Sequence, residues 1–269
     1  MEKDTGKIIE KIMGDSGHDF HLTISKLLEE KEWTVTNSPH YNDPVENKPR
    51  EIDIIAEKNI QVGGGMFSNS TETLTIRLII ECKYIKPHIV FWFLDKDPIK
   101  SKQLAKNNPI LQNQEDFYLN YENKMHHYLK DNEAVKEFST ENDNKILDKA
   151  KNEVMHASLF YSNKRGGNYN TVNYPLILVP DFTKFKRAAS DGNKYEDIKN
   201  NFEIEVEYTY KDKPEYFLID VVSKKTIDDF LNYLDNNDIK ILKTALYNSI
   251  EEREFKKRNA RQNNQNGYW

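Results

Sequence analysis

Apolar residues recur at helical spacing in several parts of the chain and predict amphipathic helices there. In residues 17–31, Phe20 and Ile24 fall on one face, and the preceding Asp15 and Ser16 are favourable N-cap residues. The same spacing predicts further helices at residues 117–128, 146–161, 226–234 and 239–250.

Shorter runs of β-branched and aromatic residues predict strands at residues 33–36, 50–57, 73–83, 89–94, 176–179, 202–210 and 216–222. The continuous apolar run 89–94 predicts a strand buried on both faces, and the alternating run 202–210 a half-exposed strand. The proline-rich segment 37–49 is expected to be a loop, and the glycines at 63–65 a turn. Together these elements predict an α/β fold with a central mixed β-sheet flanked by helices.

Composition narrows the class of protein. The chain has 269 residues, of which 31% are charged, and its net charge of −5 excludes a polybasic protein that binds nucleic acid by bulk charge. The single cysteine, Cys82, excludes an internal disulfide and a cysteine-based zinc cluster. With no apolar run of signal-peptide or membrane-span length, we expect a cytoplasmic protein that does not enter a membrane. We expect one domain over residues 1–250, followed by a basic and then Asn/Gln-rich tail at 251–269.

The strand at 73–83 carries the candidate chemistry. Because side chains alternate between the faces of a strand, one face should carry Leu74, Ile76, Leu78, Ile80 and Cys82. Glu81 and Lys83 share the opposite face, and Asp53 lies in the strand predicted just before. If the two strands are neighbours, these three charged side chains meet at one end of the sheet.

Charged groups among Ile and Leu side chains are costly unless they are paired or bound to a metal ion. A divalent cation such as Mg²⁺ relieves the repulsion between two carboxylates and polarises a phosphate. A lysine ammonium beside it can orient the attacking water. Asp53, Glu81 and Lys83 therefore indicate metal-dependent hydrolysis of phosphodiester bonds.

The order of these motifs resembles the PD-(D/E)XK, or restriction-endonuclease-like, nuclease superfamily, in particular its Mrr-like and defence-associated branches. The resemblance rests on three stretches: Gly17-His-Asp-Phe20, Pro49-Arg-Glu-Ile-Asp-Ile-Ile-Ala56 and Ile80-Glu-Cys-Lys-Tyr84. It covers residues 17–94, leaving residues 95–215 as family-specific additions.

The resemblance implies a DNA endonuclease that depends on Mg²⁺ or Mn²⁺ and serves prokaryotic defence against phage or foreign DNA. Asp53, Glu81 and the main-chain carbonyl of Cys82 would then bind the metal, and Lys83 would be the catalytic lysine. Cutting both strands of DNA needs two sites, so a homodimer or larger assembly is expected. Arg50, Arg77 and Lys86 are candidates for contacts with the DNA backbone; only the last of these, Lys86, lies outside a predicted strand.

One departure from the family pattern keeps an alternative open. Many relatives have a glutamate where this chain has His21, which can still bind a metal or its water but favours softer ions than Mg²⁺. The alternative is a subunit with the nuclease fold that does not cut, or that stays silent until a partner or effector binds.

Two further pairs of residues, each containing histidine, lie outside these motifs and are not expected to bind a metal. Glu153 and His156 have a metal-site spacing on a helix, but no second copy accompanies them, so we expect a solvated helix face. His126 and His127 are adjacent, and on the predicted helix they would point apart and not share one ion.

Overall fold

The computed structural model describes residues 6, 18–63, 65, 70–97, 99–100, 104, 108, 110–111, 125–128, 133–139, 145–163, 170–188 and 194–266. Within this part of the chain, ten strands form one mixed sheet and two more form a small antiparallel sheet. The large sheet has the order β1 (Thr34–Asn37), β4 (Ile54–Gly63), β5 (Thr71–Cys82), β8 (Thr171–Val179), β12 (Lys213–Ser223), β11 (Phe202–Tyr210), β7 (Glu133–Ser139), β6 (Ile89–Asp95), β9 (Phe185–Ala188) and β10 (Tyr195–Asp197). The small sheet pairs β2 (His40–Asn42) with β3 (Pro49–Glu51).

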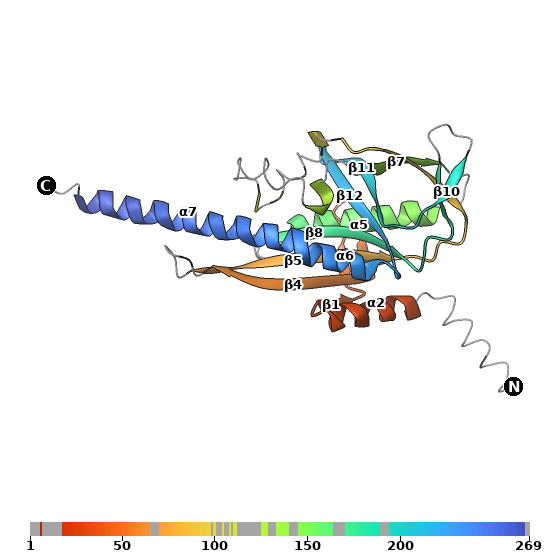
Figure 1. The fold of residues 1–269 in the computed structure, drawn as a ribbon, viewed down its shortest axis with the longest axis horizontal. Coiled ribbons are helices and arrows are strands. Elements are labelled where there is room, and N and C mark those ends of the chain that lie inside the picture. The colour runs from red at the N-terminus through yellow and green to blue at the C-terminus, as the bar shows by residue number, and fades with distance from the viewer. Residues whose placement is uncertain are drawn as a thin grey trace.

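The helical segments are α2 (His18–Glu30), the 3-10 turn η1 (His126–Tyr128), α5 (Lys145–Asn163), α6 (Ile227–Tyr233), the π-helical turn η2 (Leu234–Asp238) and α7 (Ile239–Asn266). Figure 1 shows α7 running along the sheet and then well beyond it toward the C-terminus. The α/β class with a central mixed sheet and flanking helices is therefore confirmed. No helix in the described part of the chain has both the length and the apolar character needed to cross a membrane.

The sheet separates two apolar cores, one on each face. On one face, α2, α6 and α7 pack against alternate residues of β4, β5 and β8, including Ile54, Ile80 and Leu176. On the other face, α5 packs through Leu147 and Val154 on the intervening residues of the same strands. β5 is thus buried on both sides, and its alternation decides which side chains meet α5.

Most of the predicted elements are confirmed. α2 has the predicted bounds to within a residue, and Ile24 and Leu28 on its apolar face are fully buried. On β5, the face predicted to carry Leu74, Ile76, Leu78, Ile80 and Cys82 packs in the core with α2 and α7. The predicted helix at 117–128 lies mostly outside the described residues, and its described end is the turn η1.

Three predictions about strands are corrected. β6 is not buried on both faces, because Trp92 and Leu94 point away from the α5 core and are 39% and 51% exposed. β11 is half-exposed only in its second half, since its first residues lie in the middle of the sheet between β12 and β7. The segment 37–49 is not all loop: His40–Asn42 pairs with the residues before β4.

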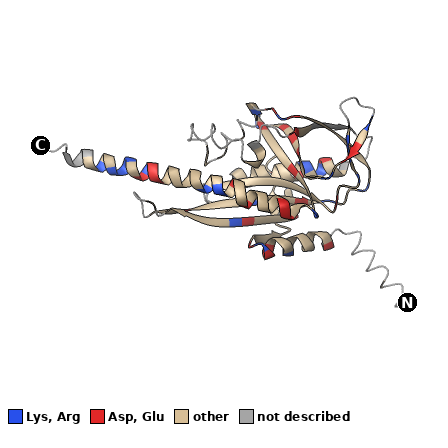
Figure 2. Cartoon of the chain, viewed as in Figure 1, with Lys and Arg blue, Asp and Glu red and all other residues tan. Residues whose placement is uncertain are grey.

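The basic part of the predicted tail continues helix α7. Lys256 and Lys257 contact acidic residues of the same helix, Glu252 at 2.6 Å and Glu254 at 2.7 Å. Figure 2 shows Lys and Arg interspersed with Asp and Glu along this helix. The tail therefore presents mixed charge and not a continuous basic surface over residues 251–262.

Candidate active site at the ends of β4 and β5

The pairing of β4 with β5 brings Asp53 and Glu81 together. The two strands are antiparallel neighbours that pair Ile54 with Ile80, so Asp53, just before β4, lies opposite Glu81. Asp53 Oδ2 accepts a hydrogen bond of 2.7 Å from the main-chain N–H of Cys82. This bond holds one carboxylate oxygen of Asp53 against the end of β5.

Lys83 lies between two glutamates that come from different elements. Its main-chain N–H donates to Leu178 O at 2.8 Å, which ties the residue to β8. Its ammonium contacts Glu81 Oε1 and lies 3.2 Å from Glu153 Oε2 on α5. The site is therefore a charged cluster under α5, with one lysine between buried carboxylates.

Burial and neighbouring charge change the acidity of this cluster. Glu81 is 3% exposed, and burial together with the charge of Asp53 raises its pKa to about 9, with Lys83 acting in the opposite direction. Burial disfavours the charged Lys83, but Glu81 and the other carboxylates outweigh it and raise the pKa of the ammonium. The excess of carboxylates over lysine is the condition in which a bound cation is stabilised.

One buried carboxylate oxygen of the cluster is suited to bind a metal ion. Glu81 Oε2 is buried and accepts no hydrogen bond from a donor group of the described residues, and the carboxylate of Glu153 is its side-chain neighbour. A buried carboxylate oxygen without a donor is costly, and a hard divalent cation is a suitable partner for it. Asp53 and Glu81 therefore fit the requirements of a Mg²⁺ or Mn²⁺ site, and the main-chain carbonyl of Cys82 directly follows Glu81 in the sequence.

Glu153 belongs to this cluster, and the prediction that it lies on a solvated helix face is wrong. Its side chain is 10% exposed and reaches Lys83, and its main-chain carbonyl accepts a hydrogen bond of 3.3 Å from the Tyr41 hydroxyl. A signal was present, because Glu153 follows Ala150 by three positions and precedes Ala157 by four. Both alanines are fully buried, so Glu153 shares the face of α5 that packs on the sheet.

His156 is also buried, but it belongs to a structural network. Its Nδ1 lies 2.8 Å from Asp43 Oδ2, which also contacts Arg50 Nε at 2.6 Å. The other oxygen of Asp43 accepts from the main-chain N–H groups of Val45 and Glu46 at 2.8 and 3.1 Å. The guanidinium of Arg50 supplies positive charge to Asp43, and the network ties the β2–β3 hairpin to α5.

His21 on α2 contacts the end of β1 close to Asp53. His21 is 7% exposed and its Nε2 lies 3.1 Å from Asn37 Oδ1, one residue before the Ser38 N–H that donates to Asp53 O. It therefore supports the main chain beside Asp53, and among the described residues its ring is hydrogen-bonded to Asn37 and not to Glu81.

The three basic candidates differ in their availability. Arg50 is held by Asp43, and Arg77 donates to Glu57 at 2.6 Å with its guanidinium 5.0 Å from the Tyr161 ring centroid. Lys86 is exposed. A role in contacting DNA phosphates remains a prediction for all three, and Lys86 is the one whose side chain faces solvent.

A second cluster corrects the prediction for the adjacent histidines. His126 and His127 lie in the 3-10 turn η1 and not in a regular α-helix, and both rings meet the same carboxylate. His126 Nε2 is 2.5 Å from Asp220 Oδ1, and His127 Nε2 is 2.8 Å from Asp220 Oδ2. The two rings meet at Asp220 because its carboxylate presents a different oxygen to each of them.

Comparison with known proteins does not assign this chain to a family. No protein-family model, no curated protein and no solved structure matches it. The function is therefore argued from the geometry of the side chains themselves.

Proposed function

We propose that the chain is a metal-dependent endonuclease that hydrolyses phosphodiester bonds in DNA. The observation that carries the proposal is the meeting of Asp53, Glu81 and Lys83 at neighbouring strand ends, with one buried oxygen of Glu81 lacking a donor. This is the residue set that the resemblance to PD-(D/E)XK nucleases implies, and the setting in prokaryotic defence is proposed on that resemblance.

The roles of the residues follow from their contacts. A bound Mg²⁺ or Mn²⁺ would supply charge neutralisation and polarisation of the scissile phosphate. Asp53 and Glu81 would hold it, and the hydrogen bond from Cys82 N–H keeps the Asp53 carboxylate oriented for this. Lys83 would direct its ammonium at the attacking water and at the charge that develops on the phosphate.

Glu153 is proposed to position Lys83. In the structure the ammonium contacts both Glu81 and Glu153. With Glu81 as a metal ligand, Glu153 would still pair with Lys83 and favour its protonated form at the edge of the site. Glu153 thus acts through Lys83 and does not itself touch the reacting atoms.

The test is cleavage of plasmid DNA by the purified full-length chain with Mg²⁺ or Mn²⁺. We expect cleavage that chelator abolishes, and a loss of at least ~10³-fold in Asp53→Asn and Lys83→Met. Asp229→Asn and Lys243→Met, both at exposed helical positions, are the matched controls and should cut like the wild type. Equal cutting by all variants would place the activity elsewhere.

The alternative function, a nuclease-fold subunit that does not cut, is favoured by one observation. Lys83 is already engaged by Glu81 and Glu153, which would keep it from a water molecule in a silent form. Calorimetric measurement of Mn²⁺ binding distinguishes a silent nuclease from a scaffold subunit. Binding that Asp53→Asn abolishes, without cleavage of DNA, would indicate a site awaiting a partner or effector. An absence of binding would leave a scaffold role.

A further inference from the structure

Two carboxylates lie directly opposite each other in the middle of the sheet, away from the proposed active site. Asp220 on β12 pairs in register with Glu203 on β11, and their exposed fractions are 1% and 3%. Like charges in directly opposed positions of an antiparallel pair destabilise a sheet. Buried as they are, these two carboxylates require compensating positive charge.

One lysine compensates part of this charge. Lys96, which is 4% exposed, lies 2.5 Å from Glu203 Oε2 and also donates to His127 O at 3.4 Å. Asp238 adds a third buried carboxylate, whose oxygens accept from His126 N–H at 2.9 Å and from the Tyr174 hydroxyl at 2.7 Å. The lysine thus meets Glu203, whereas Asp220 depends on the two imidazole rings.

The histidine rings supply the donor atoms that a metal needs. One ring nitrogen of His126, one ring nitrogen of His127 and one carboxylate oxygen of Asp220 all lie within 4.8 Å of one another. His126 Nε2 is also 3.7 Å from Glu203 Oε1. Two imidazole nitrogens and one or two carboxylate oxygens suit Zn²⁺, whereas Mg²⁺ prefers oxygen ligands alone.

The distances allow an ion with small adjustments. Tetrahedral Zn²⁺, with bonds of about 2.0–2.1 Å, separates its ligand atoms by about 3.3 Å. The two nitrogens lie 2.5 and 2.8 Å from Asp220, so side-chain shifts of less than about 1 Å would open the site. His126 carries part of its ring to the surface, which makes such a shift feasible.

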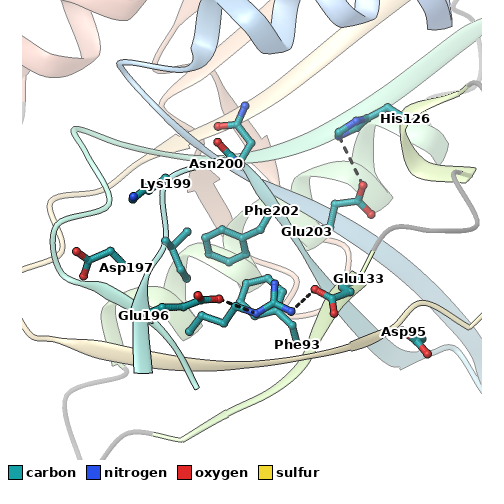
Figure 3. A pocket seen from close by; sticks show the side chains of 13 residues that line it. Phe93, Asp95, His126, Glu133, Glu196, Asp197, Lys199, Asn200, Phe202 and Glu203 are labelled. Atoms are coloured by element: carbon teal, nitrogen blue, oxygen red, sulfur yellow. Dashed lines mark hydrogen bonds and ion pairs between the residues drawn. The ribbon is translucent and has the colours of Figure 1, made fainter. Parts of the chain in front are cut away.

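A cavity of about 730 Å³ reaches this cluster from the outside and is lined by both His126 and Glu203. Figure 3 shows the His126 ring at the edge of the cavity, turned toward the Glu203 carboxylate. Lys199 and Arg187 also line it. A metal ion bound here would therefore exchange with solvent and could accept a ligand from the cavity.

We propose that His126, His127 and Asp220 form a binding site for Zn²⁺, with Glu203 as a fourth ligand. The site is separate from Asp53, just before β4, and from Glu81 on β5. This proposal can be tested independently of the proposed nuclease function, because it concerns different residues and a different ion.

The experiment is a calorimetric titration with Zn²⁺ of the full-length chain. The chain is first stripped of metals with chelator and then transferred to buffer that contains excess Mg²⁺. We expect one Zn²⁺ per chain, and binding at least ~10-fold weaker in His127→Gln and Asp220→Asn. Asp53→Asn and His88→Gln are the controls, the second being an exposed histidine, and both should bind Zn²⁺ like the wild type. Co²⁺ in place of Zn²⁺ should give visible absorption bands that His127→Gln abolishes.

Loss of the buried Asp220 charge could itself unfold the protein, so His126→Gln is the second variant, and thermal unfolding of each metal-free variant checks the fold. No Zn²⁺ binding by the folded wild type would overturn the proposal. So would unchanged binding in His126→Gln and His127→Gln, or binding lost in Asp53→Asn alone, which would assign the ion to the other site.

Discussion

Replacing Glu81 by Gln should stabilise the metal-free protein at pH 8 and change it much less at pH 5. Burial and the neighbouring carboxylates raise the pKa of Glu81 from 4.5 to about 9, so the folded protein keeps a proton that the unfolded chain releases. A group with a raised pKa stabilises the fold below its unfolded value, and this contribution is lost as the pH rises toward the folded value. Gln carries the same shape without the titrating charge.

The magnitude follows from the proton linkage. One retained proton lowers the free energy of unfolding by at most about 1.4 kcal/mol per pH unit. Between pH 5 and pH 8 the wild type should therefore lose up to about 4 kcal/mol relative to Glu81→Gln. The side chain is 5% exposed, so solvent screens this effect little.

The assay is urea unfolding in chelator at pH 5, 6.5 and 8 for the wild type, Glu81→Gln and Glu207→Gln. Glu207, whose side chain is 62% exposed, is the matched control and should follow the wild type at every pH. If Glu81→Gln also runs parallel to the wild type, or is the less stable protein at pH 8, the raised pKa is refuted. Added Mn²⁺ should stabilise the wild type at pH 8 and leave Glu81→Gln unchanged.

Three further predictions concern stability in urea at neutral pH. Ile24→Ala on α2 should lower the free energy of unfolding by about 2–5 kcal/mol because Ile24 is fully buried. Leu22 lies on the same helix and is 51% exposed, so Leu22→Ala should change the free energy of unfolding by less than ~0.5 kcal/mol. Equal effects of the two substitutions would contradict the packing of α2. Asp43→Ala should cost about 3–5 kcal/mol because Arg50 and His156 lose their shared partner, and a neutral result would mean that the network is not structural. Tyr174→Phe should cost about 1–3 kcal/mol because Asp238 Oδ2 loses its donor, while an unchanged midpoint would show that water replaces the hydroxyl.

The proposed active site could be predicted in part from the sequence. Alternation on β5 placed Glu81 and Lys83 on one face and Cys82 on the other, and this is how the strand packs. The alternation of side chains between two faces is a local property of a strand, so it does not depend on which strands lie next to it. The meeting of Asp53 with Glu81 and Lys83 was expected only on condition that the two strands are neighbours, and the pairing of β4 with β5 meets that condition. The hydrogen bond from Cys82 N–H to Asp53 was not expected from the sequence.

The partners of Glu153, His126 and His127 could not be predicted from local sequence patterns. Glu153 is separated by about seventy residues from Lys83, and the approach of α5 to β5 decides its burial. The spacing of Glu153 from Ala150 and Ala157 indicates the packed face of α5, but it does not identify Lys83 as the partner of Glu153. His126 and His127 similarly depend on Asp220, which reaches them only because β12 lies in the middle of the sheet.

The sequence by itself determined the local elements of this protein: the helices, the clear strands and the faces of β5. These follow from the spacing of apolar side chains, which report burial within one segment. Only the tertiary structure decided the order of the ten strands and the partners of the buried charges. The physical reason is that a charge is stabilised by groups within a few ångströms in space, and the chain brings those groups from β5, α5, η1 and β12 by packing alone.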